Sequence, residues 1–131
     1  MPDENDKRVL VDTNIWINHL QDGNLPLFSD LLIQDQIILS DWVELELLCG
    51  TKNKGERAFL TRHFKGILRP AQAVTPPNAC RFIEDHDLGG RGLSAVDAIL
   101  LLEAQTNQAL LWTNDRALRR ASQSLKISFE P

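Results

Sequence analysis

The sequence predicts an α/β fold, with helices layered on a mostly parallel β-sheet, in a single domain over residues 1–131. Two observations predict it. Short apolar segments typical of buried strands alternate along the chain with longer segments whose apolar residues recur at helical spacing. The composition, 43% hydrophobic and 24% charged, is that of a globular chain that buries one core. No repeat or linker-like segment divides it.

In the first half, two strands are each followed by helices. Residues 1–8 are acidic and polar, which predicts a flexible leader rather than a signal peptide. Pro26 suits the first turn of one helix, and Gly50 ends another. Asp41, three residues before Glu44, predicts a capping box. The predicted elements are strand 8–11, helices 14–20 and 25–34, strand 37–40, and helices 41–49 and 54–67.

In the second half, one long helix is apolar almost all round, which predicts a central position. Prolines bound a short segment before it, which favours an edge strand. Glycines around Arg91 predict a flexible loop. The predicted elements are edge strand 69–77, helix 78–88, loop 89–92, central helix 94–106, strand 109–113, helix 114–123 and a final strand 125–129.

Four acidic residues occupy unusual places in this pattern. Asp12 ends the first strand, and Asp115 follows the strand before the last helix. Glu46 lies inside the helix after the second strand, and Asp97 lies in the first turn of the central helix. Because ligands gather at the carboxyl ends of parallel strands, the topology predicts that all four meet at one rim of the sheet.

Each acid also has a purely structural interpretation. Asp97 completes a capping box with Ser94, and Asp115 suits a helix start. Glu46 resembles a solvated helix residue. Asp12 is the hardest to explain structurally, since Thr13 is available to cap the following helix. The argument for a site therefore depends on the set of four acids rather than on any one of them.

Gathered carboxylates need a compensating charge, because two of them about 5 Å apart repel by roughly 3 kcal/mol at an effective dielectric of about 20. No Cys/His ligand cluster is apparent, so oxygen ligands predict Mg²⁺ or Mn²⁺. Such an ion also reconciles the net charge of −4 with a polyanionic substrate. Cys49 and Cys80 lack metal-ligand spacing and are interpreted as reduced thiols of a cytoplasmic protein.

At these acids the sequence resembles the PIN-domain ribonucleases, and more narrowly the VapC-type toxins of type II toxin–antitoxin pairs. The matching stretches are "VLVDTNIWI", "ELLCG", "LSAVDAILLLEA" and "LLWTNDRAL", in the family's order. The resemblance implies a three-layer α/β/α sandwich with about five strands. It also implies a metal-dependent endoribonuclease whose catalytic and metal-binding acids are Asp12, Glu46, Asp97 and Asp115.

Further roles follow from the same resemblance. A hydroxyl or amide near the metal would come from Thr13, Thr113 or Asn114. Glu46 fits the "E-L-L-x-G" pattern and Glu44 does not, and a helix points these two side chains about 200° apart. The implied partners are an RNA substrate, a VapB-like antitoxin and a second copy of the chain.

Basic residues are the candidates for touching RNA. Arg91 lies in the loop before the Asp97 helix, Arg116 follows Asp115, and Arg57 belongs to the densest basic region of the chain. Each has an equally simple interpretation as a solvated side chain. The longest apolar run is too short to span a membrane, so no membrane association is expected.

Two alternatives remain open. The first is a catalytically silent PIN-fold module that binds a protein and keeps only remnants of a metal site. The second is a phosphatase of the haloacid dehalogenase type, which also uses an aspartate at a strand end. That chemistry needs a second aspartate two positions after Asp12, where this chain has Asn14.

Overall fold

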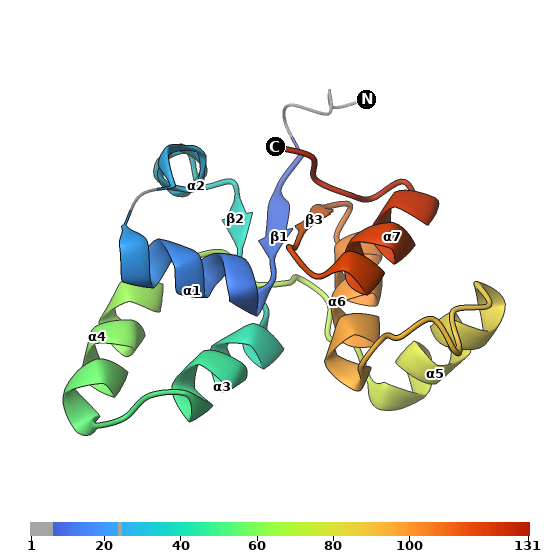
Figure 1. Cartoon of the computed structure of the whole chain (residues 1–131), viewed down its shortest axis with the longest axis horizontal. Helices are drawn as coiled ribbons and strands as arrows, with labels where there is room; N and C mark the ends of the chain where they lie inside the picture. The colour runs from blue at the N-terminus through green and yellow to red at the C-terminus, as the bar shows by residue number, and fades with distance from the viewer. Residues whose placement is uncertain (1–6, 24) are drawn as a thin grey trace.

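Three short parallel strands form the centre of the protein, in the order β2-β1-β3 (Figure 1). The computed structural model describes residues 7–23 and 25–131, so most of the predicted leader lies outside the described residues. The strands are β1 (Val9–Val11), β2 (Ile37–Ile38) and β3 (Leu110–Trp112), and every residue in them is buried. Burial on both faces is expected of a parallel sheet covered by helices, and it confirms the predicted fold class.

Single parallel bridges extend the sheet by one position at each edge. Leu68 lies beside Ile38 of β2, and Ser128 lies beside Leu111 of β3. The predicted strand 69–77 is therefore wrong, since the bridge at Leu68 lies just before it. The predicted strand 125–129 is wrong in extent, since only Ser128 forms a bridge. The first segment contains prolines, which have no N–H to donate to a neighbouring strand. In the second, Lys126 has a φ of 61°, which is incompatible with an extended strand.

Seven helices cover the sheet in the described part of the chain. Figure 1 shows α1, α3 and α4 to one side of the central strands and α5, α6 and α7 to the other. The predicted central helix is α6, whose buried residues run without a break over 98–104. The helices are α1 (Thr13–Asp22), α2 (Pro26–Ile33), α3 (Asp41–Cys49), α4 (Lys54–Phe64), α5 (Pro76–Asp85), α6 (Ala95–Thr106) and α7 (Arg116–Ser124).

The starts of the helices follow from local hydrogen bonds. The predicted capping box of α6 is confirmed: Ser94 Oγ accepts from the backbone N–H of Asp97, and the Asp97 carboxylate accepts from the N–H of Ser94. The capping box predicted at Asp41 is wrong. Ser40 caps α3 instead, because its hydroxyl accepts from the N–H of Trp42 at 3.2 Å.

The core is continuous through the sheet. Trp16 of α1 is fully buried and packs edge-on against Phe28 and Phe64. Trp112 of β3 is also buried and contacts Phe129. These rings fix α1, α2 and α4 on the sheet, so the carboxyl ends of the strands have firm positions. In the described part of the chain, no helix has the length and apolar character needed to cross a membrane.

Candidate functional site

The four acids predicted from the sequence lie around one open cleft at the carboxyl ends of the strands. Asp12, Glu46, Asp97 and Asp115 all line this cleft, whose volume is about 510 Å³. They come from the end of β1, the middle of α3, the first turn of α6 and the start of α7. The expected convergence of the four acids at one rim is therefore present in the geometry.

Asp12 lies at the centre of the hydrogen-bond network and is only 7% exposed. Its backbone N–H donates to the carbonyl of Trp112, which continues the pairing of β1 with β3. One carboxylate oxygen accepts from the backbone N–H of Thr13 at 2.7 Å, and the other accepts from the Thr113 hydroxyl at 2.7 Å. Asp12 is thus itself the N-cap of α1, whereas the sequence suggested Thr13 for this role.

Asn14 and Thr113 connect the ends of β1 and β3. The Asn14 amide donates to Asp12 at 3.2 Å, while its carbonyl oxygen accepts from the backbone N–H of Asn114 at 3.1 Å. Thr113 Oγ1 donates to Asp12 and accepts from the backbone N–H of Asp115 at 3.0 Å. Of the three predicted supporting residues, Thr113 touches Asp12 through its side chain, whereas Asn114 takes part through its backbone.

Asp97 and Asp115 are each held by the start of a helix. One oxygen of Asp97 accepts from the backbone N–H of Ser94 at 2.9 Å. Asp115 is the N-cap of α7, and its Oδ2 accepts from the backbone N–H of Leu118 at 2.9 Å. Among the described residues, the second carboxylate oxygen of each aspartate accepts no hydrogen bond, so it is available to a ligand in the cleft.

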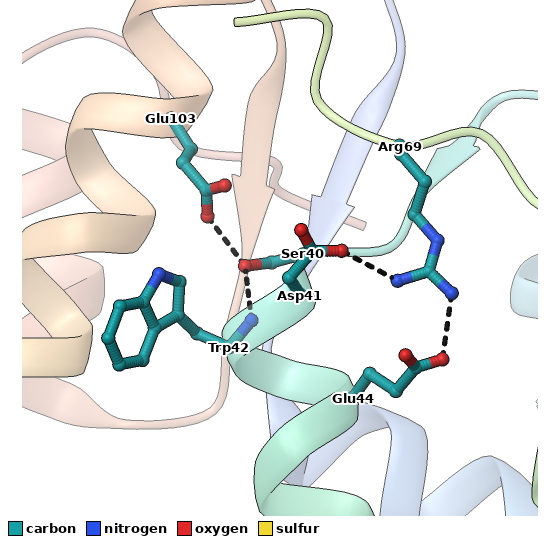
Figure 2. Close-up of polar contacts among 6 residues, drawn as sticks. All are labelled: Ser40, Asp41, Trp42, Glu44, Arg69 and Glu103. Carbon is teal, nitrogen blue, oxygen red and sulfur yellow. Dashed lines mark hydrogen bonds and ion pairs between the residues drawn. The ribbon is translucent and has the colours of Figure 1, made fainter. Parts of the chain in front are cut away.

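Glu46 and Glu44 point to different places, as predicted from helical geometry. Glu46 lines the cleft and accepts a hydrogen bond from the Thr13 hydroxyl at 3.3 Å. Glu44 instead pairs with Arg69 at 2.7 Å (Figure 2). The structure therefore favours Glu46 over Glu44 as the glutamate of the site.

The two helices that carry Glu46 and Asp97 are joined by a buried hydrogen bond, shown in Figure 2. Ser40, at the start of α3, donates its hydroxyl hydrogen to Glu103 of α6 at 2.6 Å. Both residues are buried, with exposed fractions of 0% and 5%. Burial raises the pKa of the Glu103 carboxyl, and the nearby Asp41 raises it further. This contact fixes α3 against α6 beneath the cleft.

The electrostatics of the cleft are those of crowded carboxylates. Burial is the main cause that raises the pKa of Asp12; its hydrogen bonds lower it, and the charges of Asp97 and Asp115 raise it again. Although Glu46 is exposed as a residue, the partial burial of its carboxyl raises its pKa, and the neighbouring charge of Asp12 raises it further. No lysine, arginine or histidine lies among the described residues that line the cleft. No basic side chain in the lining therefore compensates its negative charge.

The donor set fits a hard divalent cation, because it consists of carboxylate and hydroxyl oxygens. The uncompensated charge supports the same fit. The side chains do not yet adopt the geometry of a metal site. Over residues 7–23 and 25–131, no three carboxylate, imidazole or thiol groups lie close enough together to ligate a metal ion. The helix-capping hydrogen bonds of the three aspartates account for their present orientation.

The predicted basic residues lie in different places. Arg91 and Arg116 line a second hollow that borders the acidic cleft through Asp115. Arg57 is exposed on α4 and lines neither the hollow nor the cleft. The structure thus brings two of the three arginines to the edge of the candidate site.

Comparison with known proteins places the chain in a family. The model of the family described as "PIN domain" matches residues 9–123. The chain belongs to the PIN-domain family. Ribonuclease VapC32, found in two strains of Mycobacterium tuberculosis, is 34% identical over 114 residues, which are 86% of this chain and 89% of that protein.

A solved structure agrees with the PIN fold. The crystal structure of FitAcB from Neisseria gonorrhoeae superposes with a TM-score of 0.61 at 19% identity. The superposition covers 88% of this chain and 93% of that chain. At this level of identity the likeness concerns the PIN fold alone.

Sequence reasoning missed two contributors to the network of this PIN domain. Asn14 was considered only as the residue that argues against a phosphatase, yet it bridges Asp12 to the backbone of Asn114. Its D-x-N spacing at a strand end was the available signal. Glu103 was not singled out, although a glutamate inside the apolar run "AILLLEA" indicates a buried partner such as Ser40.

Proposed function

We propose that this PIN domain is a metal-dependent endoribonuclease that hydrolyses RNA phosphodiester bonds and acts as the toxin of a VapBC-type toxin–antitoxin pair. The observation that carries the proposal is the lining of one cleft by four carboxylates, with no basic side chain among the residues that line it. The similarity to Ribonuclease VapC32 over most of both chains supports ribonuclease chemistry.

In this proposal, Asp12 and Asp97 ligate a Mg²⁺ or Mn²⁺ ion directly, and Glu46 and Asp115 complete the site. The chemistry that the ion supplies when bound is activation of the attacking water and stabilisation of the negative charge that grows on the phosphodiester. The chain's own residues hold the ligands in place. Thr113 and Asn14 orient the Asp12 carboxylate through hydrogen bonds at 2.7 Å and 3.2 Å.

Thr13 has a supporting role in the same proposal. Its hydroxyl donates to Glu46 at 3.3 Å while its backbone N–H donates to Asp12 at 2.7 Å. One residue at the start of α1 therefore links the carboxylate of β1 to that of α3. Such fixed orientation lowers the reorganisation needed when substrate enters.

The proposal includes two protein partners. A small VapB-like antitoxin would cover the acidic rim, and a second copy of the chain would form a homodimer. Both cysteines are free thiols, which agrees with a proposed site of action in the cytoplasm.

The test is cleavage of structured RNA by the purified protein with Mg²⁺ or Mn²⁺, compared with an Asp12→Asn variant. We expect the wild-type protein to produce discrete RNA fragments and the variant to produce at least a hundredfold fewer. Equal cleavage by both proteins would contradict the proposal.

Tight antitoxin binding without cleavage of any RNA would instead support the alternative of a catalytically silent PIN-fold module. Phosphatase chemistry finds no support, because Asn14 occupies the position of the second aspartate.

A further inference from the structure

A hollow lined by three arginines adjoins the acidic cleft. Arg91, Arg116 and Arg120 line it together with Asp115, and its volume is about 530 Å³. Asp115 also lines the acidic cleft, so the two hollows share one wall. On one side of Asp115 the protein surface is therefore lined by carboxylates, and on the other side it is lined by arginines. This basic surface exists although the net charge of the chain is −4.

The three guanidinium groups have no acidic partner among residues 7–23 and 25–131. The two arginines that form ion pairs there are Arg69, with Asp41 and Glu44, and Arg119, with Glu130. Asp115 forms no ion pair with them in the described part of the chain, and its Oδ2 accepts from the backbone N–H of Leu118. Three arginines and one aspartate leave the lining of the hollow with a net positive charge. The positive charge of the hollow is therefore free to meet a ligand.

The arrangement of these arginines disfavours the folded state when nothing is bound. Arg116 and Arg120 are four residues apart on α7, where like charges repel. Arg116 is also the first residue of the helix, where the helix dipole disfavours cations. Arg91 adds a third positive charge from a different segment. An anionic ligand would relieve all three effects.

The loop that carries Arg91 is held against α7. Gly92 has a φ of 80°, and a Cβ atom at this position would lie 3.6 Å from the Cβ of Ala117. The loop backbone therefore passes close to the first turn of α7, beside Arg116. This packing places Arg91 over the hollow without any contact from its own side chain to an acid.

We infer that this hollow, which we call the arginine pocket (Arg91, Arg116 and Arg120), binds a backbone phosphate of RNA next to the scissile one. The inference rests on the proposed function, since it assigns a substrate subsite to the same cleft. Guanidinium groups bind phosphate oxygens through paired hydrogen bonds. Because the pocket and the cleft share Asp115, an RNA strand held in the cleft would continue past Asp115 into the pocket. The acidic cleft then performs the chemistry while the arginine pocket holds the substrate.

The experiment compares two triple variants of the full chain. The pocket variant carries Arg91→Gln, Arg116→Gln and Arg120→Gln. The control variant carries Arg62→Gln, Arg81→Gln and Lys126→Gln, which remove the same charge from exposed positions that line neither hollow. Circular dichroism and thermal unfolding establish that both variants are folded. Fluorescence anisotropy then measures the binding of a labelled single-stranded RNA oligonucleotide from low to high salt.

We expect the pocket variant to bind RNA at least tenfold more weakly at about 0.1 M salt. The slope of log Kd against log salt should fall by about 0.7, since the pocket holds one phosphate and each lost phosphate contact on a single strand contributes about 0.7. In cleavage assays the KM should rise while kcat stays within about twofold. A pocket variant rebuilt with lysine at the three positions should recover part of the affinity, and the control variant should change by less than twofold.

Two outcomes would overturn the inference: an equal loss of RNA affinity in the control variant, or unchanged RNA affinity in the pocket variant, including the case in which the pocket variant loses only the binding of polyglutamate. That last case would assign the pocket to an acidic polypeptide. In each of these cases cleavage by the wild-type protein would leave the proposed function intact. Pocket-dependent RNA binding by a wild-type protein that cuts no RNA would support the subsite and contradict the proposed function.

Discussion

Ser40 donates a hydrogen bond of 2.6 Å to Glu103 in the interior of the protein, and this contact joins helix α3 to helix α6. The same hydroxyl accepts from the backbone N–H of Trp42, so Ser40 caps α3 while it satisfies a buried carboxyl (Figure 2). Because α3 carries Glu46 and α6 carries Asp97, the contact fixes the separation of two walls of the acidic cleft.

Replacing Ser40 with alanine should destabilise the fold. The change removes an N-cap, which costs about 1 kcal/mol, and leaves a buried Glu103 oxygen without its donor, which costs about 1–3 kcal/mol more. Urea unfolding should show this loss for Ser40→Ala. A Ser40→Thr variant keeps the hydroxyl and serves as the control, and an unchanged midpoint in the alanine variant would contradict the assigned role.

The stability of the protein should depend on pH through Glu103. Burial raises the pKa of its carboxyl above the usual value, so the stabilisation it provides is fully present at acidic pH and is lost as the pH rises through the raised pKa. A Glu103→Gln variant has no such loss. The free energy of unfolding of Glu103→Gln minus that of the wild type should therefore increase from pH 4 to pH 8 in urea titrations. A constant difference would argue against a raised pKa.

Glu46→Gln should abolish most RNA cleavage, whereas Glu44→Gln should leave it nearly unchanged. Glu46 lines the acidic cleft, and Glu44 pairs with Arg69 away from it. The two substitutions remove the same charge from the same helix and form a matched pair. We expect kcat/KM to fall at least tenfold for Glu46→Gln and less than twofold for Glu44→Gln in Mn²⁺. The opposite order would place the wrong glutamate in the site.

Thr113→Val should impair cleavage while keeping the shape of the side chain. The substitution removes the donor to Asp12 and the acceptor of the Asp115 N–H, so two of the four acids lose an orienting contact. Loss of these two hydrogen bonds, of which the one to Asp12 is buried, should also lower stability by about 1–2 kcal/mol. Thr113→Ser retains the hydroxyl and should keep most of the activity. Wild-type rates in Thr113→Val would show that Asp12 needs no such partner.

Divalent ions should stabilise the wild-type protein against heat. A ligand that binds only the folded state at about 100 times its Kd adds about 2.7 kcal/mol. We expect the thermal midpoint of the wild type to rise in Mg²⁺ or Mn²⁺, and that of Asp12→Asn to rise much less. In the presence of a chelator, the thermal midpoint of Asp12→Asn should be higher than that of the wild type. The substitution removes a buried negative charge that Asp97 and Asp115 repel. Equal shifts in both proteins would place the ion elsewhere.

Much of this architecture was predictable because local signals agreed with the global fold. The apolar strands, the central helix and the capping box of α6 all follow from residue patterns that act over a few positions. The convergence of the four acids followed from one topological rule, since parallel strands point the same way and their carboxyl ends share a rim.

Other features depend on contacts between distant residues and were not predictable. The edge segments near Leu68 and Ser128 have strand-like sequences, but prolines and a backbone turn limit each to one bridge. Ser40 rather than Asp41 caps α3, because the end of β2 places its hydroxyl between Trp42 and Glu103. No local pattern shows that Glu103, on a separate helix, will be that partner.

Three of the four acids at the rim also begin helices: Asp12 caps α1, Asp97 completes the capping box of α6, and Asp115 caps α7. Natural selection for a stable fold alone would preserve these aspartates in a descendant that no longer cuts anything. Glu46, in the middle of α3, closes no helix and is exposed. In comparisons between species, loss of this glutamate would therefore be the earliest trace of an enzyme that had decayed into a scaffold.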